Sequence, residues 1–172
     1  MIQEFFVALF KAGLPVGLAG YALVWWAMKQ DYLGPASSMK ELEKEAKRLA
    51  KDKETDSRTD PLHSKWMKFG GGFYGVVGLL TYAVVELAEI RDFFTQFESI
   101  GALIAGISIE SLIGLFIGAL MNFIVAIAWP AYWISDIRSD YIWIWFLAAY
   151  AGYWAGTRLA LKHANGQGAD II

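Results

Sequence analysis

Residues 110–134 contain one charged side chain, Glu110, within a long run of apolar and small residues. A helix that crosses a membrane needs about 20 consecutive, mostly apolar residues. Three more segments of the 172-residue chain meet that requirement, at about 5–28, 69–88 and 141–161. The sequence therefore predicts an all-α polytopic membrane protein, a four-transmembrane-helix bundle that forms a single membrane domain over residues 1–172.

The composition points to the same class and excludes several others. Hydrophobic residues make up 56% of the chain and aromatic residues 16%, which is too apolar for an ordinary soluble domain of this length. Cysteine is absent, which excludes disulfides, thiolate metal sites and cysteine catalysis. The net charge of −2 offers no basic surface, so we expect no nucleic-acid partner.

The loop of residues 29–68 carries ten of the fifteen Lys and Arg residues. Cytoplasmic loops of membrane proteins retain Lys and Arg. We therefore expect this loop in the cytoplasm and both termini outside it, with the protein in a membrane such as the bacterial cytoplasmic membrane.

A short amphipathic helix is predicted inside that loop. Ser38 and Glu41 form the S-x-x-E pattern of a helix start. Apolar residues then recur at helical spacing along a charged helix: Met39, Leu42, Ala46 and Leu49. This seam predicts contact with the bilayer surface, the bundle or a partner protein, and the alternative is a solvated charged helix.

Tryptophan favours membrane interfaces, because its ring is apolar and its N–H can meet water. Seven of the eight tryptophans fall where the predicted helices meet the cytoplasmic side: Trp25, Trp26, Trp66, Trp129, Trp133, Trp143 and Trp145. The sequence therefore predicts one aromatic belt at that interface.

A second amphipathic segment follows the predicted helix of residues 69–88. Its apolar residues have the spacing of one helical face: Ile90, Phe93, Phe94 and Phe97. We expect a short helix in the outer interface. Residues 99–109 are too few to span, so they are interfacial, re-entrant or an outward extension of the third helix.

Small residues recur every fourth position along the third and fourth predicted helices. The ridge predicted to pack against other helices consists of Gly106, Gly114, Gly118, Asn122, Gly152 and Gly156. Helices in lipid associate by close packing, which small residues permit. Asn122, near the middle of its segment, is expected to hydrogen-bond to another helix.

Each predicted crossing carries one ionisable side chain in its outer half: Lys11, Glu86, Glu110 and Arg158. Counting inward from the tryptophans at about 1.5 Å per residue puts all four at a similar depth. One interpretation is a neutral polar cluster that faces the interior of the bundle. The other is that the basic side chains extend to the headgroups and the carboxylates are interfacial.

No sequence pattern indicates catalysis, a cofactor or a metal site. His63 and His163 each lack a second His at ligand spacing, and no phosphate-binding or nucleophile motif occurs. We therefore expect a protein that is not an enzyme and that acts by association, as an accessory, assembly or scaffold subunit of a membrane complex or as a homo-oligomer. Its expected partners are membrane lipids and other membrane subunits or itself. The alternative is a small transporter or channel for an ion, proton or polar solute that uses the four charged residues.

Overall fold

The structure is a computed structural model that describes residues 2–30, 32, 38–51, 65–66, 68–95 and 108–167. This part of the chain is helical, as the sequence predicts. Gly106, His63, Phe97 and residues 99–107 lie outside it, as do the side chains of Met39, Ala46 and Leu49.

The first helix is continuous from Ile2 to Lys29, but it contains one wider turn. It consists of α1 (Ile2–Ala8), the π-helical turn η1 (Leu9–Gly13) and α2 (Leu14–Lys29). Pro15 lies two residues after the end of this turn and has no N–H to donate. The N–H of Leu14 donates to the carbonyl of Leu9, five residues back, and this bond closes the π turn.

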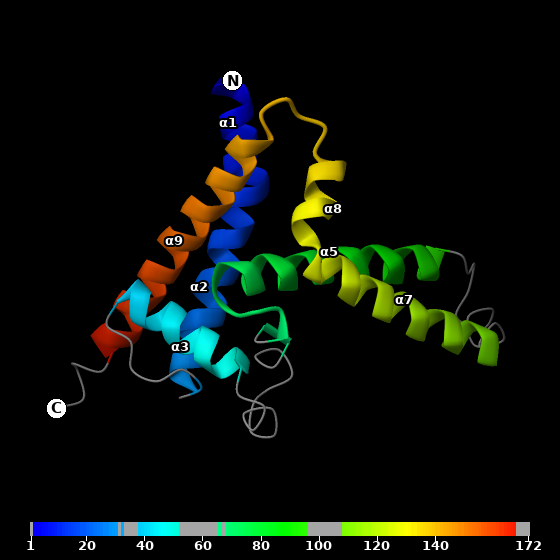
Figure 1. Cartoon of the computed structure of the whole chain (residues 1–172), viewed down its shortest axis with the longest axis horizontal. Helices are drawn as coiled ribbons and strands as arrows, with labels where there is room; N and C mark the ends of the chain where they lie inside the picture. Colours follow the sequence, from blue (N-terminus) through cyan, green and yellow to red (C-terminus); the bar gives the residue numbers. More distant parts are fainter. Residues whose placement is uncertain are drawn as a thin grey trace.

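The last helix, α9 (Ile142–Gln167), packs along the first over most of its length (Figure 1). Glycines make the contact: a side chain on Gly152 would overlap the backbone of Gly13, and one on Gly156 would overlap that of Gly17. Small residues thus let two helix backbones touch.

These contacts also show that α2 and α9 run parallel. Gly13 faces Ala148, Gly17 faces Gly152, and Gly20 faces Tyr153 and Thr157, so residue numbers rise together on both helices. The hydroxyl of Tyr21 also lies 2.8 Å from Nδ1 of His163. The start of α9 therefore lies beside α1, and its end lies beside the end of α2.

This arrangement differs from the one that the tryptophans led us to expect. Trp143 and Trp145 lie at the α1 end of the helix pair, whereas Trp25 and Trp26 lie at the opposite end. An even number of crossings would make the first and last helices antiparallel. The tryptophan pattern was misleading because a tryptophan indicates a membrane interface but does not indicate on which side of the membrane that interface lies.

Helix α5 (Gly72–Thr95) begins after a turn of three glycines. Gly70 and Gly72 have φ of 95° and 52°, a region that residues with a side chain rarely adopt. Their turn brings Trp66 against Gly75, where a Cβ would lie 2.7 Å from the Trp66 carbonyl oxygen. Trp66 is completely buried as a result, so it belongs to the core and not to an interfacial belt.

Helices α5 and α7 (Ile109–Ile127) form an antiparallel hairpin that lies crosswise to the α2–α9 pair (Figure 1). The first half of α5 is buried in the core, and its second half projects with α7 as an arm. Residues Ile90–Thr95 continue α5, so the separate interfacial helix expected there does not occur. This amphipathic segment is the last part of a longer helix and not a helix of its own.

The predicted helix of residues 110–134 is broken into α7 and α8 (Trp129–Asp136). Pro130 removes an N–H from the helical ladder at this point. The Ala131 N–H also donates to the Ala128 carbonyl and not to that of Ile127. The hydroxyl of Tyr74, on α5, donates to the Ile127 carbonyl instead. The break directs α8 away from the arm and toward the start of α9 (Figure 1).

The charged helix of the loop is α3 (Met39–Lys51). The Glu41 N–H donates to Oγ of Ser38 over 3.3 Å, which caps the helix start. Leu42 is completely buried in the main core, so at this residue the seam rests on the protein.

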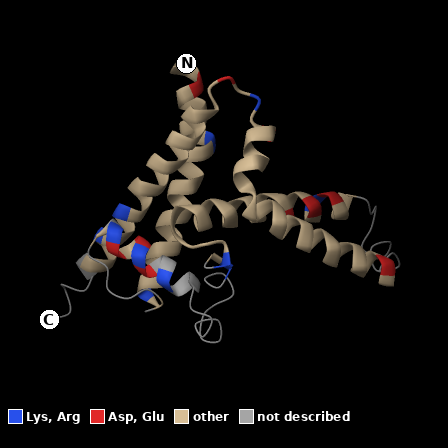
Figure 2. Cartoon of the chain, viewed as in Figure 1, with Lys and Arg blue, Asp and Glu red and all other residues tan. Residues whose placement is uncertain are grey.

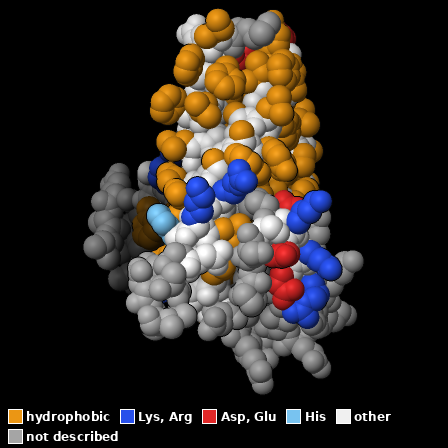
Figure 3. Space-filling model, turned by 90° about the vertical axis from the view of Figure 1, so that its left-hand side faces the viewer, with side chains coloured by type: hydrophobic (Ala, Val, Ile, Leu, Met, Phe, Trp, Pro, Cys, Tyr) orange, Lys and Arg blue, Asp and Glu red, His pale blue; other side chains and the backbone are white. Residues whose placement is uncertain are grey.

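Three helical stretches in the described residues are long and apolar enough to cross a membrane: Ile2–Lys29, Gly72–Thr95 and Ile109–Ile127. An all-helical chain with three candidate membrane-spanning helices thus fits the predicted membrane class. A four-helix bundle is not confirmed, and α9 is not among the three. Figure 3 shows apolar side chains over the upper part of the α9 side and charged ones gathered at the lower end.

Candidate functional site

In Figure 2 the charged residues outside α3 are scattered over several helices. The structure does not join the four charged residues of the predicted cluster, Lys11, Glu86, Glu110 and Arg158, in one element. They belong to four different elements, namely η1, α5, α7 and α9. In the described part of the chain, no hydrogen bond or ion pair joins any two of them. The depth estimate assumed that the first and last helices are antiparallel. Because they are parallel, Lys11 and Arg158 lie toward opposite ends of the pair.

Two of these residues face outward. Glu110 lies in the first turn of α7 and is exposed. Arg158 lies with its guanidinium 4.4 Å from the centre of the Trp154 ring, a cation–π contact on the outer face of α9. Neither residue is directed toward a shared interior.

The third, Glu86, takes part in a polar contact inside the arm. Asn122 of α7 is 3% exposed, and its amide Nδ2 lies 3.1 Å from Glu86 Oε2 and 2.8 Å from Glu89 Oε2. One amide group therefore holds two carboxylates close together. Like charges repel strongly where water is scarce, so this pair favours a nearby cation.

The two glycines of α7 near this contact, Gly118 and Gly114, have different surroundings. A Cβ on Gly118 would lie 3.0 Å from a Glu89 carboxylate oxygen, so Gly118 makes room for the acidic pair. Gly114, one turn earlier, has no atom of the described chain within 4 Å of that position. The ridge of α7 is therefore covered at Gly118 and open at Gly114.

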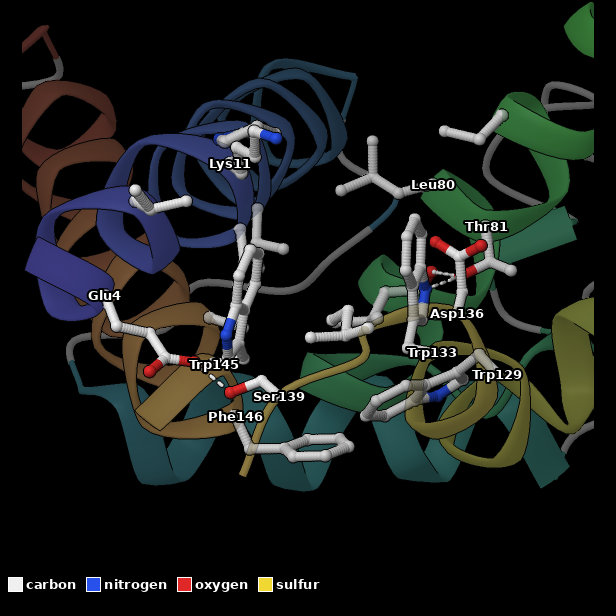
Figure 4. A pocket seen from close by; sticks show the side chains of 18 of the residues that line it. Glu4, Lys11, Leu80, Thr81, Trp129, Trp133, Asp136, Ser139, Trp145 and Phe146 are labelled. Atoms are coloured by element: carbon white, nitrogen blue, oxygen red, sulfur yellow. Dashed lines mark hydrogen bonds between the residues drawn. The ribbon is translucent and has the colours of Figure 1, made fainter. Parts of the chain in front are cut away.

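Lys11 lies at a cavity of about 840 Å³ between the first helix and α5, α8 and α9. Buried apolar residues form its bottom: Val16, Val77, Trp129 and Ala149. Charged residues form its rim: Glu4, Lys11, Asp136 and Arg138. Figure 4 shows Glu4 and Lys11 on one wall and Asp136 on the opposite one.

Hydrogen bonds hold two sides of this cavity in position (Figure 4). The hydroxyl of Ser139 donates to the carboxylate of Glu4, which ties the link between α8 and α9 to α1. The indole N–H of Trp133 donates to Thr81 Oγ1 over 2.8 Å, which ties α8 to α5. These two hydrogen bonds join the elements that line opposite sides of the cavity.

Sequence reasoning missed Glu89 and three residues of the cavity rim, Glu4, Asp136 and Arg138. The three-residue spacing from Glu86 to Glu89 places both on one helical face, which was an available signal. The cavity gave no such signal, because its rim is assembled from α1, α8 and the link that follows α8.

The described residues contain no group of three or more His, Cys, Asp or Glu side chains that could hold a metal ion. Comparisons with known proteins found no matching family model, no matching curated protein and no matching solved structure. Function must therefore be argued from the chain itself.

Proposed function

We propose that this protein is an integral membrane protein that acts by association, through the outward surface of the α5–α7 arm. It serves as an accessory, assembly or scaffold subunit of a membrane complex, or as a homo-oligomer. The observation that carries the proposal is the carboxylate pair Glu86–Glu89, held by Asn122 between the two helices of the arm.

The arm presents a large apolar surface. Only Asn122 and Ala126 of α7 are buried. The exposed large apolar side chains of α7 are Ile109, Leu112, Ile113, Leu115, Phe116, Ile117, Leu120, Met121, Ile124 and Ile127. Lipid could cover such a surface, so the apolar area alone does not indicate a partner.

The glycine and the carboxylates distinguish a protein partner from lipid. Gly114 permits the close approach of another helix backbone. Charged groups within membrane segments pair with other groups. The proposed partner therefore presents an Arg or Lys from a transmembrane helix to Glu86 and Glu89.

The proposed setting is the bacterial cytoplasmic membrane, with the loop of residues 29–68 in the cytoplasm. The positive charge of this loop supports that orientation. Helix α3 then lies on the cytoplasmic side of the assembly.

The test removes the two charges and keeps the fold. In the double variant Glu86→Gln/Glu89→Gln, the amide oxygens still accept from Asn122 but no longer attract a cation. We expect the complex isolated in mild detergent to fall apart, with the thermal stability of the chain unchanged. Asp92→Asn, an exposed position on the same helix, is the control and should leave the complex intact. A double variant that keeps the wild-type complex would contradict the proposal.

A photo-crosslinking amino acid at Ile117 identifies the partner. Ile117 on the arm should crosslink to one defined protein, and the mass of the product separates a second copy from a different subunit. Leu18, exposed on α2, is the control position and should label lipid only.

Transport is the rival function, and it requires a polar path. The dispersed positions of the four predicted residues favour association over transport. Wild-type ion flux in reconstituted vesicles that disappears in Glu110→Gln, at unchanged stability, would reverse this preference.

A further inference from the structure

The cavity beside Lys11 divides into a charged rim and an apolar bottom. Its rim residues Lys11, Asp136 and Arg138 are exposed, whereas Val16, Val77 and Ala149 at the bottom are buried. Ligand cavities commonly measure about 300–1,000 Å³, and this one, at about 840 Å³, lies within that range. A charged end and an apolar end in one cavity match an amphiphile.

The rim carries both signs of charge in equal number. Lys11 and Arg138 are basic, and Glu4 and Asp136 are acidic. Within the described ranges, no ion pair joins these four side chains to one another. A ligand that is itself both anionic and cationic would satisfy all four, whereas a simple anion would leave two carboxylates uncompensated.

The bottom of the cavity offers little to a polar ligand. The Thr81 hydroxyl, which accepts from Trp133, donates to the Val77 carbonyl over 2.8 Å. The remaining surface there is aliphatic or aromatic, with Leu80 and Phe146 beside the buried residues. An acyl chain suits this surface, since apolar burial requires no hydrogen-bond partner.

The rings of Trp129 and Trp145 also line the cavity and add to its apolar surface. Their indole N–H groups are buried within the protein, so they are not exposed to a ligand in the cavity.

We propose that this cavity binds one zwitterionic phospholipid, with its phosphate at Lys11 and Arg138, its ammonium at Glu4 and Asp136, and the start of an acyl chain against the apolar bottom. The Glu4–Ser139 hydrogen bond closes the headgroup end of the site. The lipid then forms part of the wall between the first helix and α8.

Native mass spectrometry of the full chain in detergent tests this site. After lipid removal and addition of phosphatidylethanolamine, we expect one bound lipid per chain. Lys11→Gln/Arg138→Gln should lower its affinity roughly tenfold or more, since two charge-assisted contacts are lost. Lys162→Gln, an exposed position outside the cavity, is the charge control and should retain the lipid.

A second pair of variants tests the cavity without removing charge. Val84 and Leu87 are both exposed on α5, but only Val84 lines the cavity. Val84→Trp should block lipid binding, and Leu87→Trp should not. Equal lipid retention in the two variants would overturn the site.

Two competitors test the ligand class. Phosphatidylglycerol, which is anionic, should bind more weakly than phosphatidylethanolamine. Free phosphoethanolamine should not compete, because it lacks the apolar chain. Equal or stronger binding of phosphatidylglycerol would overturn the zwitterionic assignment, and competition by phosphoethanolamine would overturn the assignment to a lipid.

Discussion

Tyr74 shows how one side chain can stabilise a break in a membrane helix. The Ile127 carbonyl has no helical partner at the break before α8, and the Tyr74 hydroxyl donates to it. In lipid, an unpaired carbonyl has no water to replace its lost bond. The position of the break thus depends on a residue of another helix, more than fifty residues away along the chain.

Replacing Tyr74 by Phe should therefore destabilise the chain. The variant keeps the ring against Trp129 but loses the donor, and we expect the free energy of unfolding to fall by about 1 kcal/mol. Tyr150→Phe, which keeps its ring contacts with Phe73 and Tyr153, is the control. Denaturation in detergent measures both, and equal values would show that the Tyr74 hydroxyl does not stabilise the break.

The residue scale also shows what the sequence could reveal. Asn122 was recognisable, because an amide in a long apolar run needs a polar partner on another helix. Its two acceptors were harder to identify, since the antiparallel register that brings Glu86 and Glu89 to it comes from the packing of α5 on α7. Sequence spacing describes one helix face but not the register between two.

At the scale of elements, glycine spacing is the same on helices that pack differently. Gly13 and Gly17 meet Gly152 and Gly156 in direct backbone contact, whereas Gly114 meets nothing within the described chain. The sequence predicted small-residue ridges on the third and fourth helices. It could not tell which ridge faces a neighbour in the same chain, because every ridge has the same pattern.

This difference predicts opposite effects for the same substitution. Gly152→Ala puts a methyl group into the Gly13 backbone and should destabilise the chain by about 1–3 kcal/mol. Gly114→Ala meets open space and should leave stability unchanged, or raise it by at most about 1 kcal/mol through better helix propensity. Thermal unfolding of the two variants in one detergent makes the comparison. Similar losses in both would show that Gly114 packs within the chain.

At the scale of the whole molecule, the existence of the long apolar helices followed from apolar length, because lipid imposes that length on any crossing helix. Apolar length did not predict that the arm lies crosswise or that α2 and α9 run parallel. The loop 29–68 has a clear orientation signal in its charge, but the short link after α8 carries only Arg138. One basic residue is a weak signal of orientation, and the structure places this link beside α1, at the opposite end of the α2–α9 pair from the end of α2.

The parallel pair makes a direct prediction about accessibility. Single cysteines at Lys40, Asp140 and Asn165 in this cysteine-free chain should label differently from outside the cell. Asp140→Cys lies at the α1 end of the pair and should react with an impermeant maleimide. Lys40→Cys and Asn165→Cys lie at the other end and should not react in intact cells. The reverse behaviour of positions 140 and 165 would support antiparallel helices instead.

The parallel contact between α2 and α9 also has a consequence for the order in which the protein is made. Ribosomes deliver α2 to the membrane first, and its partner emerges only after more than a hundred further residues, including the whole arm. Adjacent antiparallel helices can pair as soon as the second one arrives, but this pair cannot. During most of synthesis the Gly13–Gly17 face of the nascent chain is therefore without its partner helix, and it stays open to lipid or to other helices until α9 closes the fold.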